Sequence, residues 1–143
     1  MKYLITLFLF IAFAADTEAK DLAAIEYKID NPDSSFTRET GRDYAKLIAI
    51  SANVTKGLNI YNPFQLEKDI SGMGIYPERN LTLENLSALC ATRYIDYAVS
   101  GKLYKVSKGF KSESILYSAD TKSIISRSSS TAATINELAG KDA

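Results

Sequence analysis

The residue types that most often carry out enzyme chemistry are scarce in this sequence. Its 143 residues include no histidine, no tryptophan and a single cysteine, Cys90. Without histidine the chain can form neither a histidine-based catalytic triad nor a histidine-ligated metal site, and one thiol cannot build a thiolate zinc site. Cys90 lies among Ala88, Leu89 and Ala91, which predicts a small buried hydrophobic residue. Chemistry based on imidazole or on paired thiols is therefore excluded within this chain.

Carboxylates are the other residues that could support acid–base chemistry or metal binding. They do not cluster at the spacing of a ligand set or an acid–base pair, and no EF-hand loop is present. We interpret them as solvated surface charge, and we predict no catalytic residue, no cofactor and no metal. The alternative is a secreted enzyme or ligand-binding protein that uses its few carboxylates on a carbohydrate. The carboxylates considered are Asp16, Glu18, Asp30, Asp33, Glu67 and Asp69.

Lysines and aromatic residues are interleaved along a segment whose pattern is typical of a β-hairpin. Such a stripe could hold a polyanion, or the lysines could only protect a solvated hairpin from pairing with other strands. Lys102 and Lys105 differ by three positions, so they point to opposite faces of a strand, which favours the second interpretation. We nevertheless predict a protein-binding surface here, because nine tyrosines are more than one small core needs. The predicted partner-binding residues are Lys102, Tyr104, Lys108, Phe110 and Tyr117.

The charge balance bears on the choice of partner. The 17 basic and 17 acidic residues cancel, so the sequence offers no electrostatic argument for nucleic acid. We expect envelope or outer-membrane proteins as partners, or self-association.

Residues 1–15 have the pattern of a bacterial signal peptide. Lys2 precedes an apolar run that is too short to span a bilayer. Ala12 and Ala14 supply the small residues that a signal peptidase requires, and polar residues follow. Cleavage is expected after Ala14 or Ala15, and a second possible site after Ala19 would begin the mature chain at Lys20. We therefore expect an exported protein of the periplasm or outer-membrane periphery, with no transmembrane segment after cleavage.

Hydrophobic spacing over residues 16–143 predicts one domain with an α+β fold. The expected fold is a mixed sheet of about five strands with helices packed on one side and a C-terminal antiparallel meander. Val99 and Leu103 should be buried on the same face as Gly101, where a glycine within a strand indicates close approach of another backbone or a bulge. A serine-rich patch at 126–131 is either a linker or, as we favour, an exposed edge strand. Strands are expected at 22–29, 58–64, 97–106, 110–119 and 123–130, and helices from Ser34 or Ser35 to about 57, at 65–70, from Thr82 to about 94, and from Thr134 onward.

Three segments of the second half carry a resemblance to a known family. They are Ile95–Leu103 after a helix, Leu116–Ile125 after a hairpin, and the closing Ile135–Leu138. Together these segments resemble the TolB amino-terminal-like superfamily, which includes CsgG, FlgO and the lipoprotein activators of penicillin-binding proteins. In the first half, 58–61 and 65–67 look like the second strand of that family and the helix after it.

The resemblance implies a function as well as a fold. It implies a non-enzymatic interaction module, periplasmic or associated with the outer membrane, that assembles or regulates a flagellar, secretion or cell-wall machine through protein contacts. Two features depart from the family. The cysteine that anchors its lipoprotein members is missing, and the last helix is short.

The signal peptide makes a direct prediction about the exported protein. Amino-terminal sequencing of exported material should find a first residue at Ala15 or Asp16, because the apolar run ends there after small residues. Mature protein that begins at Met1 would contradict both the cleavage and the predicted export.

Overall fold

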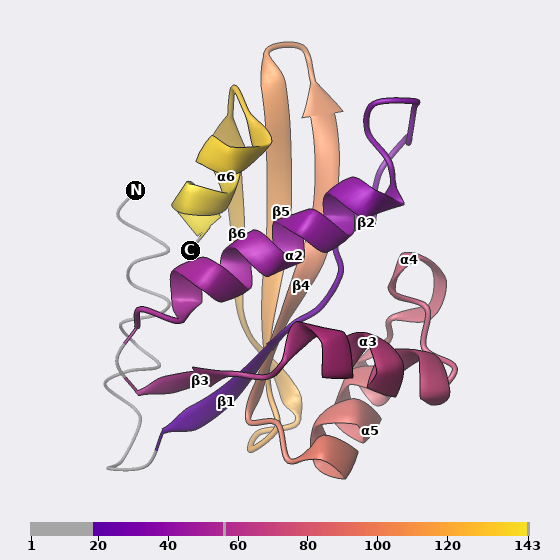
Figure 1. Ribbon diagram of the computed structural model, residues 1–143, viewed down its shortest axis with the longest axis vertical. Helices are drawn as coiled ribbons and strands as arrows, with labels where there is room; N and C mark the ends of the chain where they lie inside the picture. The colour runs from indigo at the N-terminus through magenta and orange to yellow at the C-terminus, as the bar shows by residue number, and fades with distance from the viewer. Residues whose placement is uncertain (1–18, 56, 143) are drawn as a thin grey trace.

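The computed structural model describes residues 19–55 and 57–142, and the predicted signal peptide lies outside these residues. It contains a mixed sheet flanked by helices (Figure 1). The strands lie in the order β3-β1-β4-β5-β6, and β2 also pairs with β4. The elements are β1 (Lys20–Ala24), β2 (Lys28–Ile29), α2 (Arg38–Ala52), β3 (Leu58–Ile60), α3 (Pro63–Gly72), α4 (Pro77–Asn80), α5 (Leu83–Arg93), β4 (Tyr97–Val106), β5 (Gly109–Ser118), β6 (Ser123–Ala132) and α6 (Ile135–Asp142).

The predicted α+β fold with a mixed sheet and a C-terminal antiparallel meander is confirmed. β4 pairs in parallel with β1 and β2, and antiparallel with β5, which in turn pairs antiparallel with β6. The sheet has six strands instead of about five because the predicted strand 22–29 divides in two. The division occurs at Tyr27, whose backbone N–H donates to the Gly41 carbonyl of α2 at 3.2 Å instead of to a strand.

Helices cover both faces of the sheet, so the expectation that they pack on one side was wrong. One core cluster joins α2 and α6 to the sheet through Leu22, Val99 and Leu116. The second cluster joins α3 and α5 to the opposite face through Ala23 and Ala98. Neighbouring residues of one strand point to opposite faces, and both neighbours are buried along β1 and the start of β4. The central strands are therefore buried on both sides.

Gly101 fulfils the prediction of close backbone approach. A Cβ atom at this position would lie 1.9 Å from the carbonyl oxygen of Glu113 on β5. Gly41 of α2 is under the same constraint, because its Cβ would lie 2.0 Å from the carbonyl oxygen of Tyr27. These two glycines allow β5 and α2 to approach the centre of the sheet.

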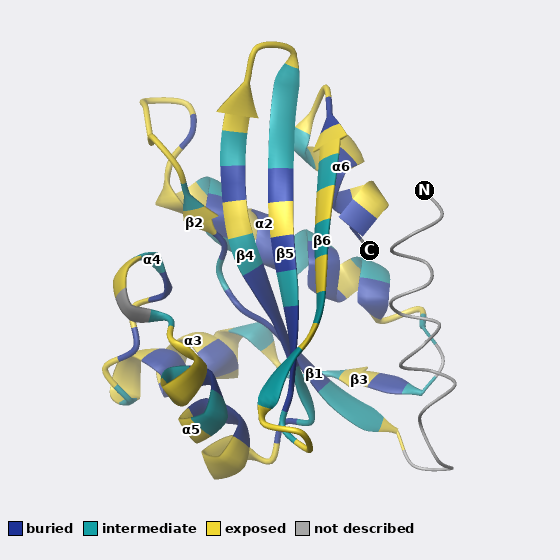
Figure 2. Ribbon diagram, turned by 180° about the vertical axis from the view of Figure 1, so that it is seen from behind, coloured by how far each residue is buried: buried dark blue, intermediate teal, exposed yellow. Residues whose placement is uncertain are grey.

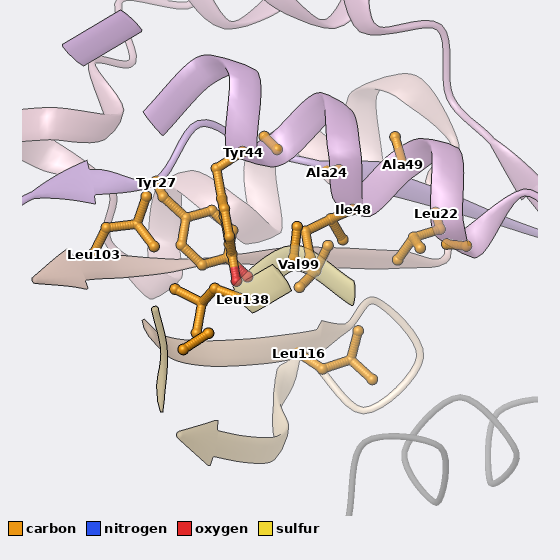
Figure 3. Packing of buried hydrophobic residues seen from close by; sticks show 14 of the residues in the cluster. Leu22, Ala24, Tyr27, Tyr44, Ile48, Ala49, Val99, Leu103, Leu116 and Leu138 are labelled. Atoms are coloured by element: carbon orange, nitrogen blue, oxygen red, sulfur yellow. The ribbon is translucent and has the colours of Figure 1, made fainter. Parts of the chain in front are cut away.

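A polar cluster lies inside the first core, between α2, β5 and α6. The rings of Tyr27 and Tyr44 meet edge to face with their centroids 4.8 Å apart (Figure 3). The Tyr44 hydroxyl donates to the Asp142 carboxylate, and the Tyr27 hydroxyl lies 2.8 Å from the hydroxyl of Ser114. Burial, followed by the charge of Asp142, raises the pKa of Tyr44, and burial raises that of Tyr27. Both phenols therefore stay neutral and serve as hydrogen-bonding groups of the core.

The ends of the helices follow local sequence signals. Thr82 caps α5 by accepting from the backbone N–H of Asn85 at 3.2 Å, and Thr134 does the same for Glu137 at the start of α6, as predicted. The predicted start of α2 at Ser34 or Ser35 was wrong, because α2 begins after Thr37. Ser34 and Ser35 belong to a turn in which the Asp33 carboxylate accepts from the backbone of Ser35 and Phe36.

The serine-rich segment is an edge strand, as we favoured over a linker. Within the described residues β6 pairs only with β5, and Ile125, Arg127, Ser129 and Thr131 are exposed. Its alternate residues face α6, whose Lys141 donates to the Thr131 carbonyl at 2.7 Å. One face of this strand is therefore covered, and the other is open to solvent.

Leu103 provides a test of the register of β4. It is fully buried, so Leu103→Ala should lower the free energy of unfolding by about 2 to 5 kcal/mol in urea denaturation. Val106 is 40% exposed at the end of the same strand, and Val106→Ala should cost less than about 1 kcal/mol. A loss below about 0.5 kcal/mol for Leu103→Ala would show that the register is wrong.

Candidate interaction surface

The predicted hairpin places Tyr104 on a solvent-facing side of the sheet. Its hydroxyl donates to the Glu113 carboxylate at 2.9 Å, and the ammonium of Lys111 bonds the other oxygen of Glu113 at 2.9 Å. The same ammonium lies 5.5 Å from the centre of the Tyr104 ring, at cation–π distance. The bonds from Lys111 and Tyr104 lower the pKa of Glu113, and the bond to Glu113 raises the pKa of Tyr104. Each of these three side chains holds the others in place.

The structure brings together only part of the predicted partner-binding set. Lys102 shares the face of Tyr104, two residues along β4, and Lys108 is exposed in the turn between β4 and β5. Phe110 lies on the other face, where its ring packs 5.6 Å from that of Phe36. Tyr117 is fully buried in the second core, so its assignment to an exposed surface was wrong. Strand alternation places Phe110 on the face opposite Tyr104, whereas Tyr117 shares the face of Tyr104 and is covered there by α3 and α5.

An exposed apolar patch lies outside the predicted hairpin. Ile50 on α2 and Phe64 at the start of α3 are 68% and 71% exposed. They line a shallow hollow of about 330 Å³ together with Ala49, Ile60 and Pro63. These five residues define the apolar patch. Large exposed apolar side chains gathered in one place mark interaction sites in soluble proteins.

The spacing of residues along α2 is a sequence signal for the apolar patch. The buried residues of α2 include Tyr44, Ile48 and Ala52, at four-residue spacing. Ile50 lies halfway between two of them and therefore on another face of the helix. α2 ends at Ala52, and Val54, two residues further on, is 87% exposed.

Two of the buried or partly buried carboxylates, Glu26 and Asp69, are engaged with basic or polar partners. Glu26 bonds Arg38 at 2.6 Å and Arg42 at 3.4 Å. Buried Asp69 would be destabilised as an anion by desolvation, but the bonds from Tyr61 and Gln65 and the charge of Arg93 lower its pKa. No group of three or more potential ligands for a metal ion occurs within residues 19–55 and 57–142.

Cys90 is a core residue, as predicted. It is buried in the second cluster, and burial together with the nearby charge of Asp96 raises the pKa of its thiol to about 11. The thiol is therefore protonated at neutral pH and lacks the reactivity of a thiolate.

Comparisons with known proteins show a fold likeness without a sequence match. No family model matches the chain, and no curated protein matches its sequence. The fold resembles the LpoB C-terminal domain. For the Salmonella enterica domain the TM-score is 0.53 at 15% identity, covering 90% of this chain and 94% of that one. For the NMR structure of E. coli LpoB the TM-score is 0.65 at 11% identity, covering 90% of this chain and 62% of that one.

TolB from Acinetobacter baumannii shares the LpoB-like fold with this chain. The TM-score is 0.52 at 14% identity over 87% of this chain, which spans about a quarter of the TolB chain, 26%. The predicted resemblance to TolB and to an LpoB-type domain is therefore confirmed at the level of the fold. The resemblance to CsgG and FlgO stays a prediction. Within the described residues, no helix combines the length and hydrophobicity needed to cross a membrane.

The two tyrosines of the predicted hairpin should respond differently to truncation. Tyr117→Ala should lower the free energy of unfolding by about 3 to 5 kcal/mol, because the side chain is fully buried. Tyr104→Ala should cost about 1 kcal/mol or less, as is usual for a surface residue. Chemical denaturation of both variants measures the difference, and equal losses would contradict this assignment of the two residues.

Proposed function

We propose that this chain is a non-enzymatic interaction module of the bacterial envelope, located in the periplasm or at the outer-membrane periphery. It assembles or regulates an envelope machine through protein contacts. The predicted signal peptide supports export, and the LpoB-like and TolB-like fold supports a place among envelope proteins. Of the flagellar, secretion and cell-wall machines implied by the sequence resemblance, we favour a cell-wall machine, because the resemblance includes activators of penicillin-binding proteins and LpoB domains share the fold.

The observation that carries this proposal is the apolar patch. The exposure of Ile50 and Phe64 to water does not stabilise the isolated domain. Burial of each side chain in an interface would contribute about 1.5 to 3 kcal/mol to the free energy of binding. The two side chains lie on α2 and α3, which are fixed by the two cores of the sheet. A rigid, partly apolar surface of this kind is the usual centre of a protein interface.

The alternative function, a carbohydrate-acting enzyme, requires a carboxyl group that stays protonated near neutral pH. Glu26 and Glu67 line one hollow of about 200 Å³, but Arg38 and Arg42 line it as well and bond Glu26. Every carboxyl of the described residues with a clear pKa shift is shifted downward, namely Asp33, Asp69 and Glu113. These groups are anions at neutral pH and are bound by basic or hydroxyl groups, which favours the binding module.

Capture from envelope extracts tests the proposal. The immobilised chain should retain an envelope protein, to be identified by mass spectrometry, and then bind the purified form of that protein. The double variant Ile50→Ser and Phe64→Ser should weaken this binding by about tenfold or more, because it removes the apolar centre of the contact. Leu83→Ser is the matched control, since Leu83 is 48% exposed on α5, outside the apolar patch.

Two results would contradict the proposal. One is equal binding by the double variant and by the unaltered chain. The other is hydrolysis of a cell-wall glycan by the purified chain that Glu26→Gln or Glu67→Gln abolishes. The fold of each variant is checked by circular dichroism before binding is measured.

A further inference from the structure

A second surface with a different character lies on the open face of the sheet. Figure 2 views the sheet from the side opposite α2, and no helix lies in front of the upper parts of β4, β5 and β6. A groove of about 670 Å³ runs between this face and the α4 segment. Lys28, Lys102 and Arg127 line it from the strands, and Arg79 lines it from α4. These four residues are called the basic groove below.

Two lysines of the basic groove occupy directly paired positions. Lys28 of β2 and Lys102 of β4 are neighbours in the register, and both are exposed. Neighbouring strands lie about 4.8 Å apart, so two ammonium groups on the same face repel each other and lower the stability of the pairing. The charge of Glu113, the neighbour of Lys102 on β5, offsets part of this repulsion, and an anion bound at this position would reduce it further.

The acidic residues beside these lysines already have other partners. Glu113 is the neighbour of Lys102 on β5, but its two oxygens bond Tyr104 and Lys111. Glu78 of α4 lies 3.4 Å from Arg38. Lys102 is one of the charges that lower the pKa of Glu113, but among the residues that the structure describes Lys28, Lys102 and Arg127 form no ion pair within 4.0 Å and no side-chain hydrogen bond. The groove therefore presents three basic groups that are available to a ligand.

We propose that the basic groove binds an extended, acidic segment of a protein partner. This inference rests on the proposed function and names the chemistry of one partner segment. In an extended segment alternate side chains point the same way about 7 Å apart, so acidic residues at every second position present a row of carboxylates to the groove. Arg127 lies on edge strand β6, two strands away from Lys102, and binds a carboxylate further along the row.

The walls of the groove favour a peptide over a polyanion such as a phosphate polymer. Leu81 and Ile115 line the groove and provide contact for aliphatic side chains. Glu78 and Glu113 line it as well, and these carboxylates would repel a ligand with a charge on every unit. A segment that alternates acidic and uncharged residues can place its carboxylates at the basic residues and keep them away from Glu78 and Glu113.

A labelled model peptide tests the inference with the full chain. The probe is a fluorescein-labelled decapeptide of alternating glutamate and serine, and its binding is measured by fluorescence anisotropy. The double variant Lys28→Gln and Lys102→Gln should weaken binding of the peptide about fivefold to tenfold. A second double variant, Lys102→Gln and Arg127→Gln, should weaken it by a similar factor. Binding should also weaken between about 50 mM and 500 mM salt.

The control variant removes two positive charges, as the groove variants do, but at positions outside the basic groove. Lys68→Gln with Lys122→Gln alters two exposed lysines, on α3 and in the turn after β5, and should change affinity less than about twofold. The melting temperature of the Lys28 and Lys102 double variant should stay equal or rise, because the variant removes a like-charge pair. If the two lysines only stabilised the fold, the melting temperature of this double variant should fall.

The outcomes separate this inference from the proposed function. Equal peptide binding by the groove and control variants would overturn the inference. Displacement of the peptide by inorganic phosphate at equal charge, or a preference for phosphatidylglycerol vesicles over the peptide, would overturn it as well. The apolar-patch variant Ile50→Ser and Phe64→Ser should bind the peptide normally. If that variant loses the envelope partner while groove variants keep both partner and peptide, only the groove inference fails.

Discussion

Strand β4 is the element on which the rest of the structure depends. It pairs in parallel with β1 and β2 along one edge and antiparallel with β5 along the other, so it joins the two halves of the chain. Its residues alternate between the two cores, with Val99 in the first and Ala98 in the second. Both helical layers therefore pack on a sheet that this strand holds together, and the apolar patch and the basic groove depend on the same sheet.

The two proposed binding surfaces differ in how they are supported. The apolar patch lies on helices that pack against opposite faces of the sheet, so the relative placement of Ile50 and Phe64 depends on both cores. The basic groove lies on paired strands, where the backbone ladder holds Lys28 beside Lys102 in spite of their repulsion. Sites built on helices and strands hold their geometry better than sites on loops, and both surfaces have that advantage.

Much of the fold follows from the sequence, because its signals are local. Alternation predicted that Val99 and Leu103 share a buried face, and capping residues predicted where α5 and α6 begin. What local signals do not contain is which face a distant helix covers. Tyr117 and Tyr104 have similar surroundings in the sequence, yet α5 and α3 cover one while the other faces solvent. The same limit explains why the apolar patch was missed: it joins residues of α2 and α3 that are 14 positions apart, Ile50 and Phe64.

The close approaches at Gly41 and Gly101 also bear on how many different sequences can adopt this fold. At both positions any larger residue would overlap a carbonyl oxygen, so only glycine fits without rearrangement. Most other core positions need an apolar side chain of suitable volume, and several residue types satisfy that need equally well. A fold in which most positions tolerate several residue types can be adopted by very different sequences. A likeness in fold to LpoB at 11% to 15% identity fits that freedom.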